Sequence, residues 1–141
     1  MLLSIKNLSA SIDNKKIIDN LSLNIKKGEI HAIMGQNGSG KSTFSNILAG
    51  KEDYEITSGE VIFNGKNLLD MNIEERSQNG LFLAFQYPVE IPGVNITPFL
   101  NTSLNARLKK EGKKEIDNLE LVKLLKTKAT ELGISLEMLK R

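Results

Sequence analysis

The sequence contains no cysteine. Disulfide bonds, cysteine-ligated zinc, cysteine-ligated iron–sulfur clusters and cysteine nucleophiles are therefore excluded for these 141 residues. A long hydrophobic run is also missing, because the longest run, residues 81–85, is far shorter than the roughly 20 residues that a membrane-spanning helix needs. The first residues lack the apolar stretch of a signal peptide. We therefore expect a cytoplasmic protein with no direct membrane insertion.

The sequence has no large excess of charge of one sign, since 19 basic residues face 17 acidic ones and the net charge is +2. This balance does not indicate electrostatic attraction to nucleic acid. Lys123, Lys126 and Lys128 lie on one face of a predicted helix, and no aromatic residue interleaves them. We interpret them as a solvated face, with a nucleic-acid patch as the less favoured alternative. The composition, 40% hydrophobic and 26% charged, is typical of one soluble globular domain.

The first part of the chain is expected to alternate short strands with helices. The predicted strands cover residues 2–8, 21–25, 29–34, 61–63, 66–69 and 81–85. A helix is predicted over residues 41–49, with Gly50 as the residue that ends it. Asn64 and Gly65 form a strong two-residue hairpin signal, because both residue types tolerate a positive φ. Asn72 with Glu75 three residues later is compatible with a short capped helix.

From Thr97 onward the pattern becomes helical, with Thr97 as a possible N-cap and Pro98 in the first position. This helix should end before Gly112, and a second should end before Gly133. Ser135 is expected to begin a last helix. The apolar positions of the two longer helices are Leu100, Leu104, Leu108, Leu121, Leu124, Leu125, Ala129 and Leu132.

A motif of the form G-x-x-x-x-G-K-[ST] lies between the predicted strand 29–34 and the predicted helix 41–49. It consists of Gly35, Gln36, Asn37, Gly38, Ser39, Gly40, Lys41 and Ser42. The glycines allow successive backbone N–H groups to turn toward one anion, and the helix start adds its free amides. A glycine-rich turn that only links a strand to a helix is the alternative, which the strand–loop–helix context disfavours. The motif predicts a nucleotide phosphate site.

Two side chains of this motif bring the chemistry of a nucleoside triphosphate site. Lys41 can reach β- and γ-phosphate oxygens as a point charge. The Ser42 hydroxyl can ligate Mg²⁺, which prefers oxygen donors. We therefore expect ATP and Mg²⁺ as the ligands of this loop.

The residues on either side of this loop indicate which class of nucleotide-binding protein the sequence resembles. Residues 21–25, Gly28 and Glu29, the loop through Thr43, and residues 48–50 resemble the opening of ATP-binding cassette (ABC) ATPase domains. This resemblance implies an α/β P-loop NTPase fold: an antiparallel β subdomain, a P-loop core and the start of a helical subdomain. It also implies that Thr43 contacts nucleotide and that Gln86 is the Q-loop glutamine, which contacts nucleotide and helps to hold Mg²⁺.

A finer resemblance lies in residues 50–55 and in residues 84–94, which read AFQYPVEIPGV. Both stretches are similar to the ATPase subunit of the SUF iron–sulfur cluster assembly system. This similarity implies SUF scaffold proteins as partners, and a second ATPase subunit that closes head to tail when ATP binds. The alternative from another class is the ATPase subunit of an ABC membrane transporter.

Several family features are missing from these residues. No Ser-Gly-Gly signature, no apolar strand ending in Asp-Glu after Gln86 and no histidine after His31 occur. Ile12 takes the place of the aromatic residue that stacks on adenine in many members. His31 itself is expected to be a packed strand residue. No catalytic residue is therefore assigned, and slow hydrolysis by this chain alone is expected.

These observations predict an incomplete ABC-type ATPase domain. Residues 1–96 are expected to form the nucleotide-binding core with the Walker A motif and the Q-loop. Residues 97–141 are expected to begin the helical subdomain, and the signature, Walker B and switch-histidine segments are expected to lie beyond this fragment. A non-catalytic nucleotide-binding remnant is the remaining alternative.

Overall fold

The computed structural model describes residues 1–87 and 89–140. Pro88, which falls within the family-like stretch 84–94, and Arg141, the end of the predicted helical part, lie outside the described residues. The chain divides into two compact units, Met1–Ala84 and Phe85–Arg141, and each is described by itself.

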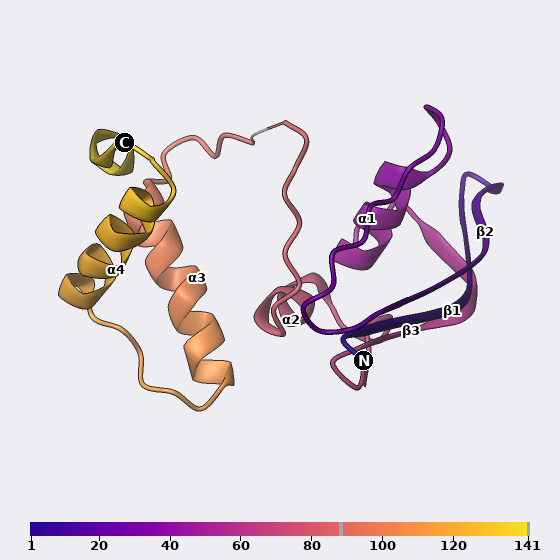
Figure 1. Cartoon of the computed structure of the whole chain (residues 1–141), viewed down its shortest axis with the longest axis horizontal. Coiled ribbons are helices and arrows are strands. Elements are labelled where there is room, and N and C mark those ends of the chain that lie inside the picture. Colours follow the sequence, from indigo (N-terminus) through magenta and orange to yellow (C-terminus); the bar gives the residue numbers. More distant parts are fainter. Residues whose placement is uncertain (88, 141) are drawn as a thin grey trace. The chain divides into compact units, whose positions relative to one another are not determined.

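The first unit is built on a four-stranded antiparallel sheet with the order β2-β1-β3-β4 (Figure 1). Its strands are β1 (Leu3–Ile12), β2 (Lys15–Ile25), β3 (Glu55–Phe63) and β4 (Lys66–Asn67). β1 and β2 are joined by Asp13 and Asn14, which both have a positive φ, as tight two-residue hairpins require. Both strands are longer than the sequence pattern predicts, because bulges shift their register and interrupt the alternation of apolar side chains.

The Asn64-Gly65 prediction is confirmed: Phe63 pairs with Lys66 across these two residues, whose φ angles are 51° and 78°. The predicted helix is confirmed as α1 (Lys41–Ala49), and Gly50 ends it in the left-handed conformation with a φ of 90°. The capped helix is confirmed as α2 (Ile73–Gln78), in which Asn72 and Glu75 form a reciprocal capping box.

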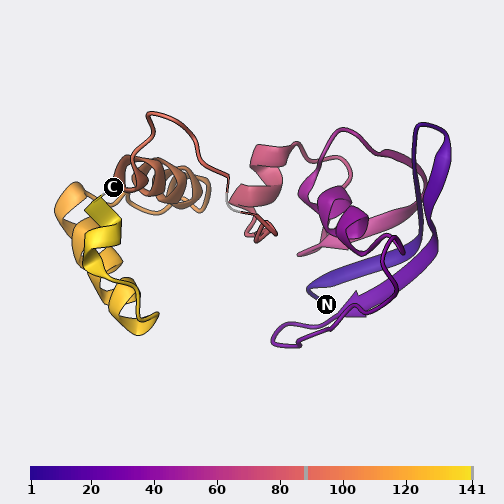
Figure 2. The ribbon, with the colours of Figure 1, turned by 90° about the horizontal axis from the view of Figure 1, so that it is seen from above.

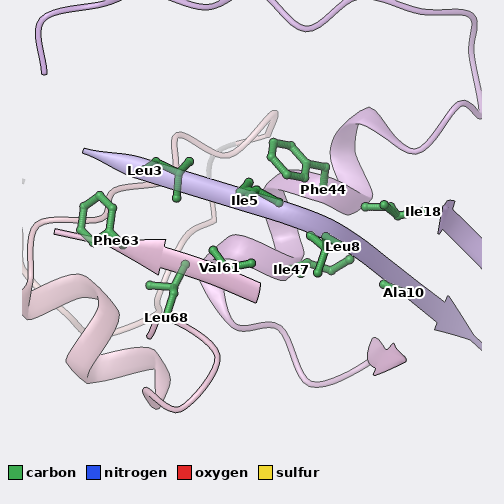
Figure 3. Packing of buried hydrophobic residues seen from close by; sticks show 10 residues of the cluster. All are labelled: Leu3, Ile5, Leu8, Ala10, Ile18, Phe44, Ile47, Val61, Phe63 and Leu68. Carbon is green, nitrogen blue, oxygen red and sulfur yellow. The ribbon is translucent and has the colours of Figure 1, made fainter. Parts of the chain in front are cut away.

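In the first unit α1 lies beside the sheet (Figure 2), and the buried side chains of the core lie between them (Figure 3). Phe44 and Ile47 of α1 pack against side chains of the strands. The buried hydrophobic residues are Leu3, Ile5, Leu8, Ala10, Ile18, Phe44, Ile47, Val61, Phe63 and Leu68. This packing fixes one face of the helix whose first residue belongs to the predicted phosphate loop.

Two strand predictions are wrong. Residues 29–34 and 81–85 are irregular and carry exposed apolar side chains, with Ile30 99% and Phe82 89% exposed. A strand is stabilised by hydrogen bonds to neighbouring strands. Within residues 1–87 and 89–140, neither segment pairs with one.

The second unit contains α3 (Ile96–Lys110), α4 (Asn118–Glu131) and a short 3₁₀ helix, η1 (Leu136–Lys140), which contact one another. α3 begins one residue before Thr97, with Asn95 as its N-cap, so the predicted start is slightly wrong. Pro98 is tolerated in the first turn because amides there have no intrahelical acceptor. As predicted, α3 ends before Gly112 and α4 ends before Gly133.

No helix in the described part of the chain is long and apolar enough to cross a membrane.

Candidate nucleotide-phosphate site

The predicted phosphate loop forms a tight turn that leads directly into α1. The Ser39 N–H donates to the Gln36 carbonyl at 3.2 Å, which closes the turn. Gly38 and Gly40 have φ angles of 82° and 89°, a region in which a side chain is strained. Glycine is therefore required at both positions for the chain to reverse before the helix.

The N-terminus of α1 is a positively polarised end with no side-chain cap. Gly40 occupies the N-cap position and makes no side-chain cap hydrogen bond, and the first turn holds no acidic residue. The amides of the first turn have no intrahelical acceptor, and the helix dipole places partial positive charge there. This arrangement suits a phosphate group.

Lys41 lies folded over its own loop. Its Nζ donates to the carbonyl oxygens of Gly35 at 2.8 Å and of Gln36 at 2.7 Å. These two carbonyls take two of the three N–H donors that an ammonium carries. The loop thus holds a cationic group beside the first amides of α1.

Ser42 and Thr43 follow Lys41 in the first turn, Ser42 exposed and Thr43 half-buried. The Ser42 hydroxyl is a hard oxygen donor, which fits Mg²⁺ in the way that nucleotide sites use it, with one protein oxygen and the remaining ligands from phosphate and water. No cluster of three or more histidine, aspartate or glutamate side chains that could hold a metal occurs among the described residues. Gln36 and Asn37, the other predicted loop residues, are exposed.

A cavity of about 420 Å³ lies beside the loop. Gly35, Gly40 and Lys41 form part of its wall, and apolar side chains of β2 and α1, including Leu23 and Phe44, form another part. Ile12, the predicted replacement for an adenine-stacking aromatic, is half-buried at the end of β1. Its role in base binding stays a prediction.

Gln86 belongs to the second unit and is exposed in an irregular stretch. The phosphate loop belongs to the first unit, and the structure describes each unit by itself. The prediction that Gln86 contacts nucleotide and Mg²⁺ therefore stays a prediction.

His31 is not the packed strand residue that the sequence predicts. It is exposed, and its Nε2 lies 3.0 Å from Oε2 of Glu29. The same carboxylate accepts from the Lys26 N–H at 2.7 Å. That backbone hydrogen bond, followed by the His31 contact, lowers the pKa of Glu29 below its usual value.

Sequence reasoning missed Arg76, a buried side chain of α2 that supports α1 at the end opposite the phosphate loop. Its Nη1 donates to the carbonyl oxygens of Ile47 and Leu48, and its Nε donates to that of Met71. Burial lowers the pKa of the Arg76 guanidinium from its ordinary value. No local pattern in the sequence indicates this role, because the contacts of Arg76 with Ile47 and Leu48 of α1 join residues 29 and 28 positions apart.

Comparison with protein families finds a match to the ABC transporter family over residues 18–137. The chain is 52% identical over 90% of its length to the probable ATP-dependent transporter ycf16 of Cyanophora paradoxa, of which it covers 49%. It is 49% identical over 99% of its length to the probable ATP-dependent transporter SufC of Escherichia coli, of which it covers 56%. The chain thus spans about half the length of these curated relatives.

Solved structures with the same fold include the dimeric post-hydrolysis state of the ATP-binding cassette MJ0796 bound to ADP and Pi. The TM-score is 0.69 at 22% identity, and the match covers 99% of this chain and 60% of that one. The ATP-binding cassette MJ1267 of an ABC transporter gives a TM-score of 0.72 at 24% identity, over 99% and 56% of the two chains. These likenesses support an ABC ATPase fold.

Proposed function

Because the chain belongs to the ABC transporter family, we propose that it forms the nucleotide-binding part of a cytoplasmic ATPase that powers iron–sulfur cluster assembly on a SUF-type scaffold. The observation that carries ATP binding is the uncapped N-terminus of α1 behind Gly40, with the Lys41 ammonium held beside it. Backbone amides and one lysine are the groups that hold β- and γ-phosphates in P-loop proteins.

In this proposal the loop amides and the first turn of α1 bind the phosphates, and Lys41 neutralises part of their charge. Bound Mg²⁺ would supply positive charge that offsets the negative charge of the phosphates. Ser42 would hold the ion through its hydroxyl, Thr43 would contact the nucleotide in the same turn, and Gln86 would contribute its side-chain oxygen.

The assignment to iron–sulfur cluster assembly is supported by residues 84–94, which resemble ATPase subunits of the SUF system, and by the 49% identity to SufC of Escherichia coli. The proposed partners are SUF scaffold proteins and a second ATPase subunit arranged head to tail. The absence of cysteine agrees with a motor role, because a cluster scaffold needs thiolates to hold iron.

A second candidate function, the ATPase subunit of a membrane transporter, is favoured by the family description and by the word transporter in the names of the relatives. The discriminating segment is again residues 84–94. A double variant, Tyr87→Ala with Pro92→Ala, should reduce co-purification with SUF scaffold proteins and leave ATP affinity unchanged. Loss of ATP binding with the scaffold still attached would contradict the assignment.

We also propose that these 141 residues alone hydrolyse ATP very slowly. The chain supplies phosphate-binding groups, but no Asp-Glu pair at a strand end and no histidine other than His31. Rapid Mg²⁺-dependent hydrolysis by the purified chain would mean that a catalytic carboxylate has been overlooked.

The first test is calorimetric titration of the chain with Mg²⁺ and ATP. Lys41→Ala should abolish measurable binding, because it removes the loop's only cationic side chain. The matched control is Lys27→Ala, which removes an exposed lysine outside the loop and should leave the affinity unchanged. Equal affinities of Lys41→Ala and the unsubstituted chain would refute the phosphate site.

A further inference from the structure

Arg76 joins three parts of the first unit through one guanidinium group. The residue is only 8% exposed. Its Nη1 lies 2.8 Å from the carbonyl oxygen of Ile47 and 3.1 Å from that of Leu48, and its Nε lies 2.9 Å from that of Met71. A guanidinium presents its donors in a rigid planar fork. The side chain therefore fixes the distance between the last turn of α1 and the turn that precedes α2.

The Arg76 contacts lie at the end of α1 opposite the phosphate loop. The last carbonyls of a helix have no intrahelical partner and carry the negative end of its dipole. A guanidinium there both donates hydrogen bonds to these carbonyls and is attracted to the dipole. Gly50 leaves room for it, because a Cβ on Gly50 would lie 3.2 Å from the Arg76 Cζ. The two ends of α1 are thus held by different groups, with the loop at one end and Arg76 at the other.

The backbone of Arg76 also contacts the segment that follows α2. Its carbonyl oxygen accepts from the Leu81 N–H at 3.1 Å. Leu81 begins the stretch of chain that leads to Gln86. Arg76 therefore contacts two elements. One is α1, which starts at the predicted phosphate loop, and the other is the segment that begins at Leu81 and leads to Gln86.

We propose that Arg76 is a positioning residue that transmits phosphate occupancy from α1 to the segment preceding Gln86. The inference rests on the proposed function, because it requires nucleotide at the loop. A phosphate that draws the N-terminus of α1 toward itself displaces a rigid helix as a whole, so the carbonyls of Ile47 and Leu48 move with it. Arg76 follows these carbonyls and carries the displacement through α2 to Leu81.

The chain offers a direct reporter for this effect because it contains no tryptophan. Tyr87 follows Gln86 and is 76% exposed, so Tyr87→Trp places the chain's single tryptophan there without loss of core packing. The full chain carrying Tyr87→Trp is titrated with Mg²⁺ and ATP. Calorimetry gives the affinity, and tryptophan emission gives the response near Gln86.

Adding Arg76→Met to the reporter chain should keep ATP affinity within about threefold while the ATP-induced emission change falls at least about fivefold. The variant removes the hydrogen bonds of the guanidinium to α1 but leaves the phosphate-binding residues in place. Measurements are made well below the melting temperature of each variant, as monitored by circular dichroism. The matched control is Arg107→Met, which removes an exposed guanidinium of α3 and should leave affinity and emission change as they were.

Arg76→Lys distinguishes the hydrogen bonds of the guanidinium from its positive charge. It also serves as the second variant if Arg76→Met fails to fold. One ammonium keeps the positive charge but cannot reproduce the rigid fork, so the emission change should stay low. A full emission change in Arg76→Met, or its full recovery in Arg76→Lys, would overturn the proposal. A fall in affinity that matches the fall in emission would also overturn it, since it would indicate a purely structural role. If the reporter chain binds no ATP at all, the proposed function and this inference both fall.

Discussion

Gly59 of β3 faces Leu8 of β1 so closely that a Cβ on Gly59 would lie 2.5 Å from the Leu8 Cα. The φ angle of Gly59 is 105°, which side chains rarely adopt. Backbone thus meets backbone beside the bulge at which the register of β1 and β3 shifts.

Gly59→Ala should lower the free energy of unfolding by about 3 kcal/mol, because it combines backbone strain with a collision that no rotamer relieves. Gly65→Ala is the matched control: Gly65 also has a positive φ, but nothing lies within 4 Å of a Cβ there. The control should lose only about 1 kcal/mol. Urea unfolding measures both losses, and equal losses would contradict the close approach.

Asn105 holds the connection between α3 and α4 by bonding both backbone groups of Ile116. Its Oδ1 accepts from the Ile116 N–H at 2.8 Å, and its Nδ2 donates to the Ile116 carbonyl at 3.1 Å. Asn105→Ala should destabilise the helical unit by about 2 kcal/mol and speed amide exchange at Ile116. Ser103→Ala, an exposed change on the same helix, should do neither. Unchanged exchange at Ile116 would refute this role.

Glu111 should make the helical unit sensitive to acid. Lys113, at 2.6 Å, and then Arg107, at 3.0 Å, lower the pKa of its carboxylate below the ordinary value of 4.5. A carboxylate with a lowered folded pKa contributes stability above its unfolded pKa and loses it as the pH falls through the folded pKa. The free energy of unfolding should therefore fall below pH 4.5, and less steeply in Glu111→Gln.

The control for Glu111 is Glu115→Gln, an exposed glutamate of the same loop, which should keep the slope of the unsubstituted chain. The difference should shrink in high salt, since exposed ion pairs are screened. Identical pH profiles for Glu111→Gln and the unsubstituted chain at low salt would show that these ion pairs do not contribute to folding.

Ser42→Ala should weaken ATP binding roughly tenfold when Mg²⁺ is present, because it removes one oxygen ligand worth about 1.5 kcal/mol. With the ion removed by a chelator, the variant and the unsubstituted chain should bind alike. Ser45→Ala is the control on the same helix, since its hydroxyl bonds only weakly to the Lys41 carbonyl at 3.4 Å. A loss that is equal with and without the ion would exclude Ser42 as a magnesium ligand.

Local features were predictable from the sequence because their causes lie within a few residues. α1 begins at Lys41 and ends before Gly50, as the glycines on both sides of it indicate. The Asn64-Gly65 turn and the Asn72–Glu75 capping box likewise depend on neighbours in the chain. The conformation of the predicted phosphate loop belongs to this group, since it is set by glycine conformations and a helix start.

Features that depend on distant partners were not predictable. The apolar runs at 29–34 and 81–85 have the pattern of buried strands, yet a strand forms only beside another strand. A local ambiguity explains the smaller error at the start of α3, which is Ile96. A proline fits several positions of a first turn, so Pro98 does not decide which residue of that turn comes first.

By itself, the sequence determined the glycine-rich turn of the predicted phosphate loop, the helix behind it and the family resemblance of residues 84–94, because each depends on consecutive residues. Only the tertiary structure decided that Arg76 supports the far end of α1 and that Gly59 meets Leu8. Both relationships join residues at least 28 positions apart, as Arg76 and Leu48 are. Their energies come from desolvation, hydrogen bonding and close packing, which arise once folding has brought the two segments together.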